Sequence, residues 1–78
     1  MPRYYFNVRH RIAELDGEGA DLLNIAAARM AAVRLCGELI REFDVNFWDD
    51  PVWRLEVTDA RQNVLFTLTF SGEEPRKR

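Results

Sequence analysis

Apolar and polar residues alternate in three stretches of the chain, and each stretch predicts a β-strand. The alternation runs over residues 3–12, 52–58 and 64–70, with the period of two that is expected when one face of a strand is buried. The expected inward residues are Tyr4, Phe6 and Val8 in the first strand, Trp53, Leu55 and Val57 in the second, and Val64, Phe66, Leu68 and Phe70 in the third.

A longer period marks residues 24 to about 43 as a helix. Asn24 is the expected N-cap, because its side chain can accept a hydrogen bond from a free backbone N–H of the first turn. Gly37 lies off the apolar stripe and costs up to about 1 kcal/mol relative to alanine. Asp49, Asp50 and Pro51 are strong helix breakers. The stripe expected to face the core consists of Ile25, Ala28, Ala32, Cys36, Leu39, Ile40 and Phe43.

Two connecting segments carry turn signals. In the stretch "ELDGEGADL", Asp16-Gly17 is a favoured hairpin dipeptide, and Leu22 with Leu23 is predicted to form a short returning strand. Residues 59–63 read as a five-residue turn, since Asp59 and Asn63 tolerate special backbone angles.

The resulting order is β-(β)-α-β-β. A single helix laid on one face of an antiparallel sheet buries both apolar surfaces. The sequence therefore predicts an α+β two-layer sandwich, with three or four antiparallel strands and one long helix. Residues 1–71 are expected to form one domain, and residues 72–78 a polar, flexible tail.

The size of the chain leaves few means of stabilising the fold. A chain of 78 residues buries only about 60% of the surface that its unfolded form exposes. With one cysteine it cannot form an internal disulfide, and one cysteine plus one histidine falls well short of the four ligands of a zinc site. Good packing and self-association are therefore the remaining means of stabilising the fold.

The charge is mildly acidic once the end of the chain is set aside. Arg76, Lys77 and Arg78 supply three of the 11 positive charges, so residues 1–75 carry eight positive against 13 negative charges, or −5. General nucleic-acid binders usually show a basic stripe instead. No apolar run approaches the roughly 18 residues of a membrane span, and the N-terminus lacks a signal-peptide core. We expect a cytoplasmic protein without membrane association.

Candidate catalytic residues are few. His10 could act as a base or metal ligand, but an exposed polar residue on a strand is the simpler reading. Ser71 lies where the last strand gives way to the tail, a poor place to hold a nucleophile rigidly. Cys36 falls on the buried stripe, where a thiol is inert packing.

An acidic cluster around two glycines is a further candidate metal site. Asp16, Glu18 and Asp21 offer oxygen ligands, but the 12-residue frame of a calcium loop is missing. A solvated turn explains them better. We expect no catalytic residue, no metal and no cofactor, and therefore no enzyme.

The outward face of the predicted sheet is the first candidate recognition surface. Aromatic and arginine side chains on an open sheet can stack nucleic-acid bases, and Tyr5, Asn7, Arg9 and Arg54 are the candidates here. An ordinary solvated sheet face is the alternative, and Glu56 would add a charge that repels phosphate.

An aromatic pair outside the periodic elements is the second candidate. Phe47 and Trp48 either fold back over the end of the core or stand out as an apolar interface anchor. An exposed edge strand would be a further docking device, because unpaired backbone groups invite strand addition.

Four segments occur together in a recognisable order: "MPRYYFNVR", "DGEG", "AAARMAAVRLCGELI" and "WRLEVTDARQNVLFTLTF". Combined, they resemble the small bacterial family catalogued as domain of unknown function 6894, from rhizobia and related bacteria. The resemblance covers Met1 to about Ser71 and implies an uncharacterised role, so it supplies no catalytic residues. Asn7 stands where members of the family often have histidine, and Asn63 where they often have glycine.

These observations favour a non-enzymatic protein-interaction module, which we expect to self-associate as a homo-oligomer such as a dimer or to bind an unknown protein partner. A nucleic-acid-binding regulator that uses the open sheet and the basic tail is the alternative. An enzyme using His10 and the acidic turn is the third and weakest reading.

Overall fold

The computed structural model describes residues 1–10, 13–49 and 51–75, without the side chain of Val45. Predicted features at Ile12, Asp50 and the basic residues 76–78 lie outside the described residues. The elements are β1 (Arg3–Arg9), β2 (Ala13–Glu14), β3 (Ala20–Asp21), α1 (Ile25–Phe43), a 3-10 helix η1 (Asp44–Asp49), β4 (Val52–Thr58) and β5 (Val64–Ser71).

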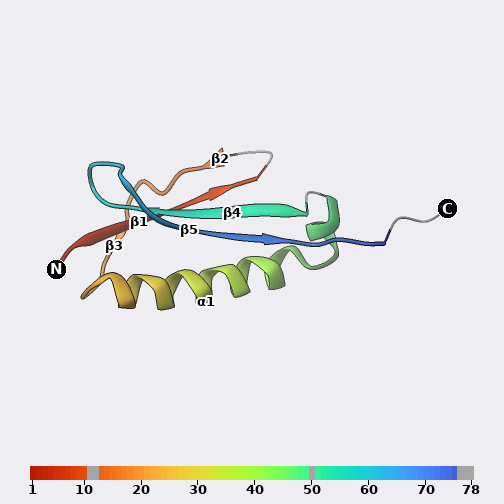
Figure 1. The fold of residues 1–78 in the computed structure, drawn as a ribbon, viewed down its shortest axis with the longest axis horizontal. Helices are drawn as coiled ribbons and strands as arrows, with labels where there is room; N and C mark the ends of the chain where they lie inside the picture. Colours follow the sequence, from red (N-terminus) through yellow and green to blue (C-terminus); the bar gives the residue numbers. More distant parts are fainter. Residues whose placement is uncertain (11–12, 50, 76–78) are drawn as a thin grey trace.

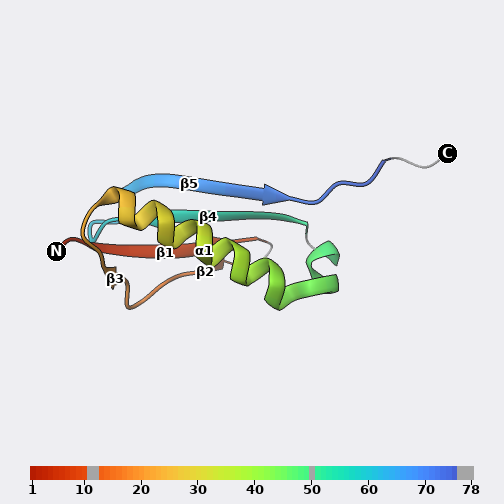
Figure 2. The ribbon, with the colours of Figure 1, turned by 90° about the horizontal axis from the view of Figure 1, so that it is seen from below.

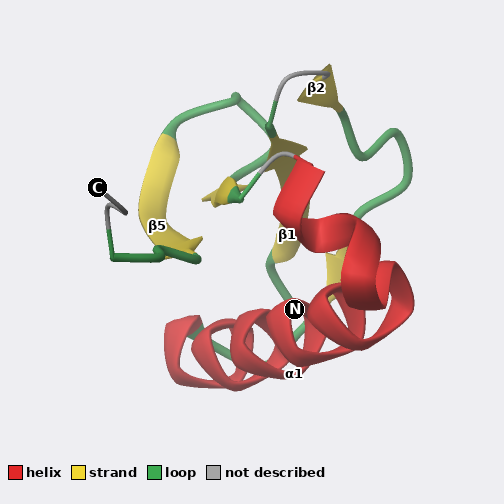
Figure 3. Cartoon of the chain, turned by 90° about the vertical axis from the view of Figure 1, so that its right-hand side faces the viewer, coloured by secondary structure: helices red, strands yellow, loops and turns green. Residues whose placement is uncertain are grey.

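Helix α1 lies along one face of an antiparallel sheet, and the two layers form the predicted α+β sandwich (Figure 1). The strand order is β2-β1-β4-β5, and β3 pairs with β1. Figure 2 shows that α1 crosses the sheet obliquely, starting near β5 and ending on the side of β1 and β2. The opposite face of the sheet carries no helix among the described residues, as the end view in Figure 3 shows.

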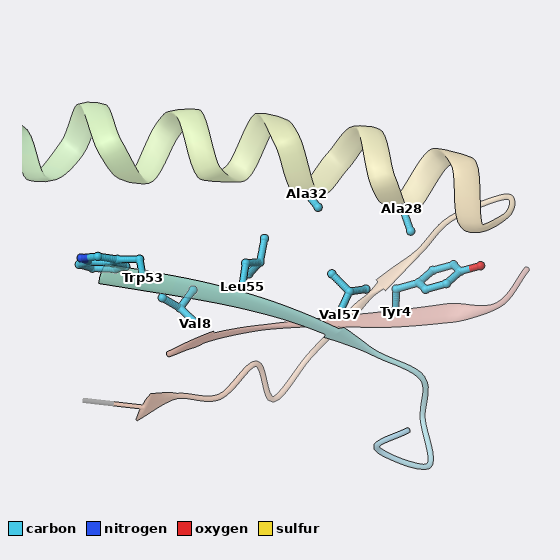
Figure 4. Close-up of a cluster of buried hydrophobic side chains, with 7 residues drawn as sticks. All are labelled: Tyr4, Val8, Ala28, Ala32, Trp53, Leu55 and Val57. Atoms are coloured by element: carbon cyan, nitrogen blue, oxygen red, sulfur yellow. The ribbon is translucent and has the colours of Figure 1, made fainter. Parts of the chain in front are cut away.

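The core lies between α1 and the two central strands (Figure 4). Ala28 and Ala32 are fully buried, and their small side chains let the helix approach the sheet closely. Leu55 and Val57 are also fully buried, which confirms the alternation predicted for β4. The buried cluster consists of Tyr4, Val8, Ala28, Ala32, Trp53, Leu55 and Val57.

The returning segment after β1 differs from the prediction. Two short strands, β2 and β3, pair with opposite ends of β1, at Arg9↔Ala13 and Arg3↔Asp21. Leu22–Leu23 is therefore not the strand, although the Leu22 N–H donates to the Pro2 carbonyl oxygen at 3.1 Å. The Asp16-Gly17 hairpin turn is also wrong, because these residues belong to a loop that interrupts the returning segment.

Helix α1 begins as predicted and departs from the predicted stripe at two residues. The Asn24 side chain accepts a hydrogen bond from the Ala27 N–H at 3.0 Å. Ile25 and Ile40, however, are 37% and 45% exposed. Ile25 lies in the first turn, at the end of the helix, and Ile40 lies about 100° around the axis from Leu39, which packs on the core. Leu35, absent from the predicted stripe, also packs there.

The β4–β5 hairpin contains one irregularity, which turns the side chain of Val64 to the opposite face of the sheet. Thr58 pairs with Val64 while Val57 pairs with Phe66, so Leu65 is an extra residue in the ladder. Because a bulge shifts the face that preceding residues occupy, Val64 does not point inward as predicted and is 55% exposed. The left-handed backbone of the turn falls on Gln62, at φ 67°, rather than on Asn63.

Candidate interaction surfaces

Three of the four predicted sheet-face residues come together around one concavity. It lies on the face opposite α1, between the 15–17 loop and the 59–62 turn, and has a volume of about 400 Å³. Arg54 does not line it, but is the cross-strand neighbour of Arg9. The lining residues are Tyr5, Asn7, Arg9, Leu15, Asp16, Gly17, Glu56, Thr58, Asp59, Ala60, Gln62 and Val64.

One wall of this concavity is held by Asn7 and Asp16. The Asn7 Oδ1 accepts a hydrogen bond from the Asp16 N–H at 2.9 Å. The Asp16 carboxylate in turn accepts from the N–H groups of Phe6, Glu18 and Gly19, at 3.1, 3.0 and 3.0 Å. Partial desolvation opposes ionisation of Asp16, but these donors outweigh it and hold its pKa below the usual range for aspartate. Both side chains therefore fix the loop.

The charge within the concavity is negative. Arg9 Nε donates to Glu56 Oε1 at 2.6 Å, and Glu56 is the more buried partner, with 17% of its side chain exposed. Asp59 at the opposite rim accepts the N–H groups of Arg61 and Asn63, at 2.8 and 3.0 Å. Three carboxylates thus stand against one arginine, which disfavours a phosphate backbone on this face.

Phe47 and Trp48 differ in how far they are buried. Phe47 packs against the core and stacks on Phe70, with ring centroids 6.2 Å apart. Trp48 meets Phe47 edge-on at 5.8 Å and is 50% exposed. A Cβ on Gly72 would lie 2.7 Å from the Trp48 ring, so the start of the predicted tail is packed beneath this aromatic pair.

Strand β5 forms one edge of the sheet, visible in Figure 2. It is eight residues long and contains neither a charged residue nor a proline. Charged residues and prolines are among the features by which proteins prevent an edge strand from pairing with another chain. Its inward residues Phe66, Leu68 and Phe70 are only partly buried, because the oblique helix leaves part of this strand uncovered. The alternation predicted the strand, but its position at the edge depends on pairing order.

A second apolar stripe, on the solvent side of α1, was missed by sequence reasoning. Met30, Val33 and Ile40 are 59%, 62% and 45% exposed, and Gly37 is exposed between them. Their spacing of three, four and three residues was the available signal, since it matches a coiled-coil seam. We call Met30, Val33, Gly37 and Ile40 the outer seam.

The candidate catalytic residues do not assemble. His10 is half-buried and stacks on Trp53, with centroids 4.0 Å apart, so the exposed position expected for it is wrong. Strand β4 separates β1, which ends beside His10, from Ser71 on β5. Burial raises the pKa of the half-buried Cys36 thiol, which disfavours the reactive thiolate.

The described residues contain no group of three or more histidine, cysteine, aspartate or glutamate side chains placed to hold a metal ion. Among the same residues, no helix has both the length and the apolar character needed to cross a membrane.

Fold and surfaces together define a small α+β sandwich with an open sheet face, an unprotected edge strand and an apolar seam on its helix. The chain belongs to the family described as domain of unknown function DUF6894, whose model matches residues 3–71. This confirms the resemblance that the sequence shows. No curated protein and no solved structure matches the chain.

Proposed function

We propose that this protein is a non-enzymatic interaction module that self-associates by pairing the β5 edges of two copies. The observation that carries the proposal is the β5 edge itself, eight residues without charge or proline. Backbone N–H and C=O groups along an edge are strong hydrogen-bonding groups and invite strand addition.

A second copy is the occupant that the edge chemistry favours. Two β5 strands related by a twofold axis pair antiparallel, and such an interface is self-complementary. Pairing would extend the sheet across both protomers and cover the partly buried Phe66, Leu68 and Phe70. A small core without disulfides gains stability from this burial.

Charged substitutions on β5 test the proposal. Thr67 and Thr69 are exposed and lie opposite Glu56 and Arg54 on β4. In T67K/T69K, or in T67E/T69E, like charges oppose one another across the twofold pair. We expect the wild-type chain to be a dimer by light scattering after size exclusion, and each variant alone to be a monomer.

A mixture of the two variants provides the decisive control. Lysines on one copy then face glutamates on the other, so an equimolar mixture should recover the dimer. Circular dichroism verifies that each variant is folded. A wild-type monomer from about 10 μM to about 1 mM, or a dimer unaffected by both variants, would refute the proposal.

A further inference from the structure

We infer that the outer seam of α1 is a docking surface for an acidic amphipathic α-helix of another protein. The seam is distinct from the β5 edge, so this inference does not depend on the proposed self-association. Three features support it: the regular spacing of the seam residues, a glycine that no contact within the described chain requires, and the positive charges on both flanks of the seam.

The spacing of the seam suits a helix as the partner. Met30, Val33, Gly37 and Ile40 recur every three or four residues, so they form a narrow line along three turns of α1, about 15 Å long. An amphipathic helix lays a line of the same period against such a surface. The seam carries no aromatic side chain, whereas helices that lie in a membrane interface typically present tryptophan or phenylalanine.

Gly37 has no role within the described chain. A Cβ added there would meet nothing within 4 Å, and its φ is not in the left-handed range. Glycine in a helix interior nevertheless costs about 1 kcal/mol relative to alanine. A gap in the middle of the seam is what close approach of a second helix requires, since a missing side chain lets two backbones come together.

The flanking charges select the partner. Arg29 lies on one side of the seam, and Arg34 and Arg41 lie on the other; all three are exposed. Arg29, Met30, Val33 and Arg34 surround a shallow depression on this face. Flanking residues of paired helices face one another across the interface and set partner choice.

A second copy of α1 fits this surface poorly. In a parallel pair, Arg29 would face Arg34 of the other copy, and in an antiparallel pair Arg34 would face Arg41. Both arrangements oppose like charges. An acidic amphipathic helix fits better. Leucine or another aliphatic residue along its seam would pack on the apolar residues of the outer seam, and glutamate or aspartate on both flanks would face the three arginines.

A designed peptide serves as the probe. It is a fluorescein-labelled four-heptad helix with leucine at both seam positions and glutamate on both flanks; the matched probe carries lysine on the flanks. Anisotropy titrations with the full-length chain should show at least about tenfold tighter binding of the glutamate peptide. Equal binding of both peptides, or no binding of either, overturns the inference.

Three variants locate the binding. Val33→Glu places a charge at an exposed seam position and should weaken binding of the glutamate peptide at least about tenfold. R29E/R34E/R41E should reverse the preference between the peptides. Arg61→Glu, in the exposed β4–β5 turn, should change neither. If V33E binds like the wild type, the seam is not the site.

The same titrations in T67K/T69K separate this inference from the proposed function, because they should give the wild-type result whatever the oligomeric state. Co-sedimentation with phosphatidylglycerol vesicles tests the other class of anionic surface. Vesicle binding that R29E/R34E/R41E abolishes, without peptide binding, would assign the seam to a membrane surface and overturn the inference.

Discussion

The Asn7 side chain accepts a hydrogen bond from the backbone N–H of Asp16 at 2.9 Å, and this bond joins β1 to the loop that walls the sheet-face concavity. Asp16 returns the connection to β1 by accepting the Phe6 N–H at 3.1 Å. A residue predicted for recognition therefore has a structural role. The Arg3 side chain reinforces the same loop by donating to the Glu18 carbonyl oxygen at 2.7 Å.

Asp16 should make stability depend on pH in the acid range. Its pKa is lower in the folded protein than the ordinary 3.8, so its stabilisation is fully present above about pH 4 and is lost as pH falls through the lowered value. Asp16→Asn should cost about 1–2 kcal/mol at pH 7. Urea unfolding at pH 7 and pH 3 should show a smaller acid-induced loss in D16N than in the wild type.

The control for D16N is Glu73→Gln, an exposed residue after β5, which should follow the wild-type curve at both pH values. Asp59 adds a contribution of the same sign, because hydrogen bonds from Asn63 lower its pKa too. D16N should therefore retain some acid dependence. An acid response identical to that of the wild type would contradict the role assigned to Asp16.

Two glycines of this loop should differ in how much their replacement by alanine destabilises the fold. Gly19 has φ 73°, and a Cβ there would lie 2.9 Å from the Tyr5 ring and 3.0 Å from the Tyr4 carbonyl oxygen. Gly19→Ala should therefore cost about 2–3 kcal/mol from strain and crowding. Gly17→Ala meets nothing within 4 Å and should change the free energy of unfolding by less than about 0.5 kcal/mol. Equal urea midpoints for the two variants would contradict this.

The sequence predicted the three long strands and the helix well, because each of them carries its own periodicity. Tyr4, Val8, Leu55 and Val57 are buried, as the period of two requires, and the side chain of Asn24 caps the helix as expected. Such features are set by residues within a few positions of one another, so they can be recognised without the tertiary structure.

The errors arise where distant contacts decide. The bulge that turns Val64 outward depends on register with Thr58, which no local pattern encodes. His10 is half-buried because its ring stacks on that of Trp53, which lies 43 positions further along the chain. The concavity, likewise, needs the 15–17 loop and the 59–62 turn to flank the same strands. The outward positions of the first strand placed Tyr5, Asn7 and Arg9 on one face, but the sequence did not reveal that Asn7 and Asp16 are hydrogen-bonded to each other or that the loop and the turn enclose this face.

Gly72 should control the position of Trp48. A Cβ at residue 72 would lie 2.7 Å from the Trp48 ring and 2.9 Å from that of Phe47. Because Trp48 is half exposed and can move, Gly72→Ala should cost only about 1 kcal/mol while increasing acrylamide quenching of tryptophan fluorescence. Trp53 is 3% exposed and contributes little to this change.

A double-mutant cycle isolates the contact between these two residues. With Trp48→Ala already present, the ring that meets the new methyl group is gone, so G72A should cost less than it does in the wild-type chain. A cost of G72A that is unchanged in the W48A background would show that the two residues do not interact.

Gly37→Ala should stabilise the isolated chain. The position is exposed within α1, and a methyl group meets nothing within 4 Å, so the gain is the difference in helix propensity, about 1 kcal/mol. For a domain of this size, that corresponds to a rise in Tm of about 4–8 °C. Gly37→Pro should abolish cooperative unfolding, because it removes a helical hydrogen bond and clashes with the preceding turn. If G37A instead lowers Tm, the glycine serves a structural need within the chain, and the partner-based explanation of Gly37 fails.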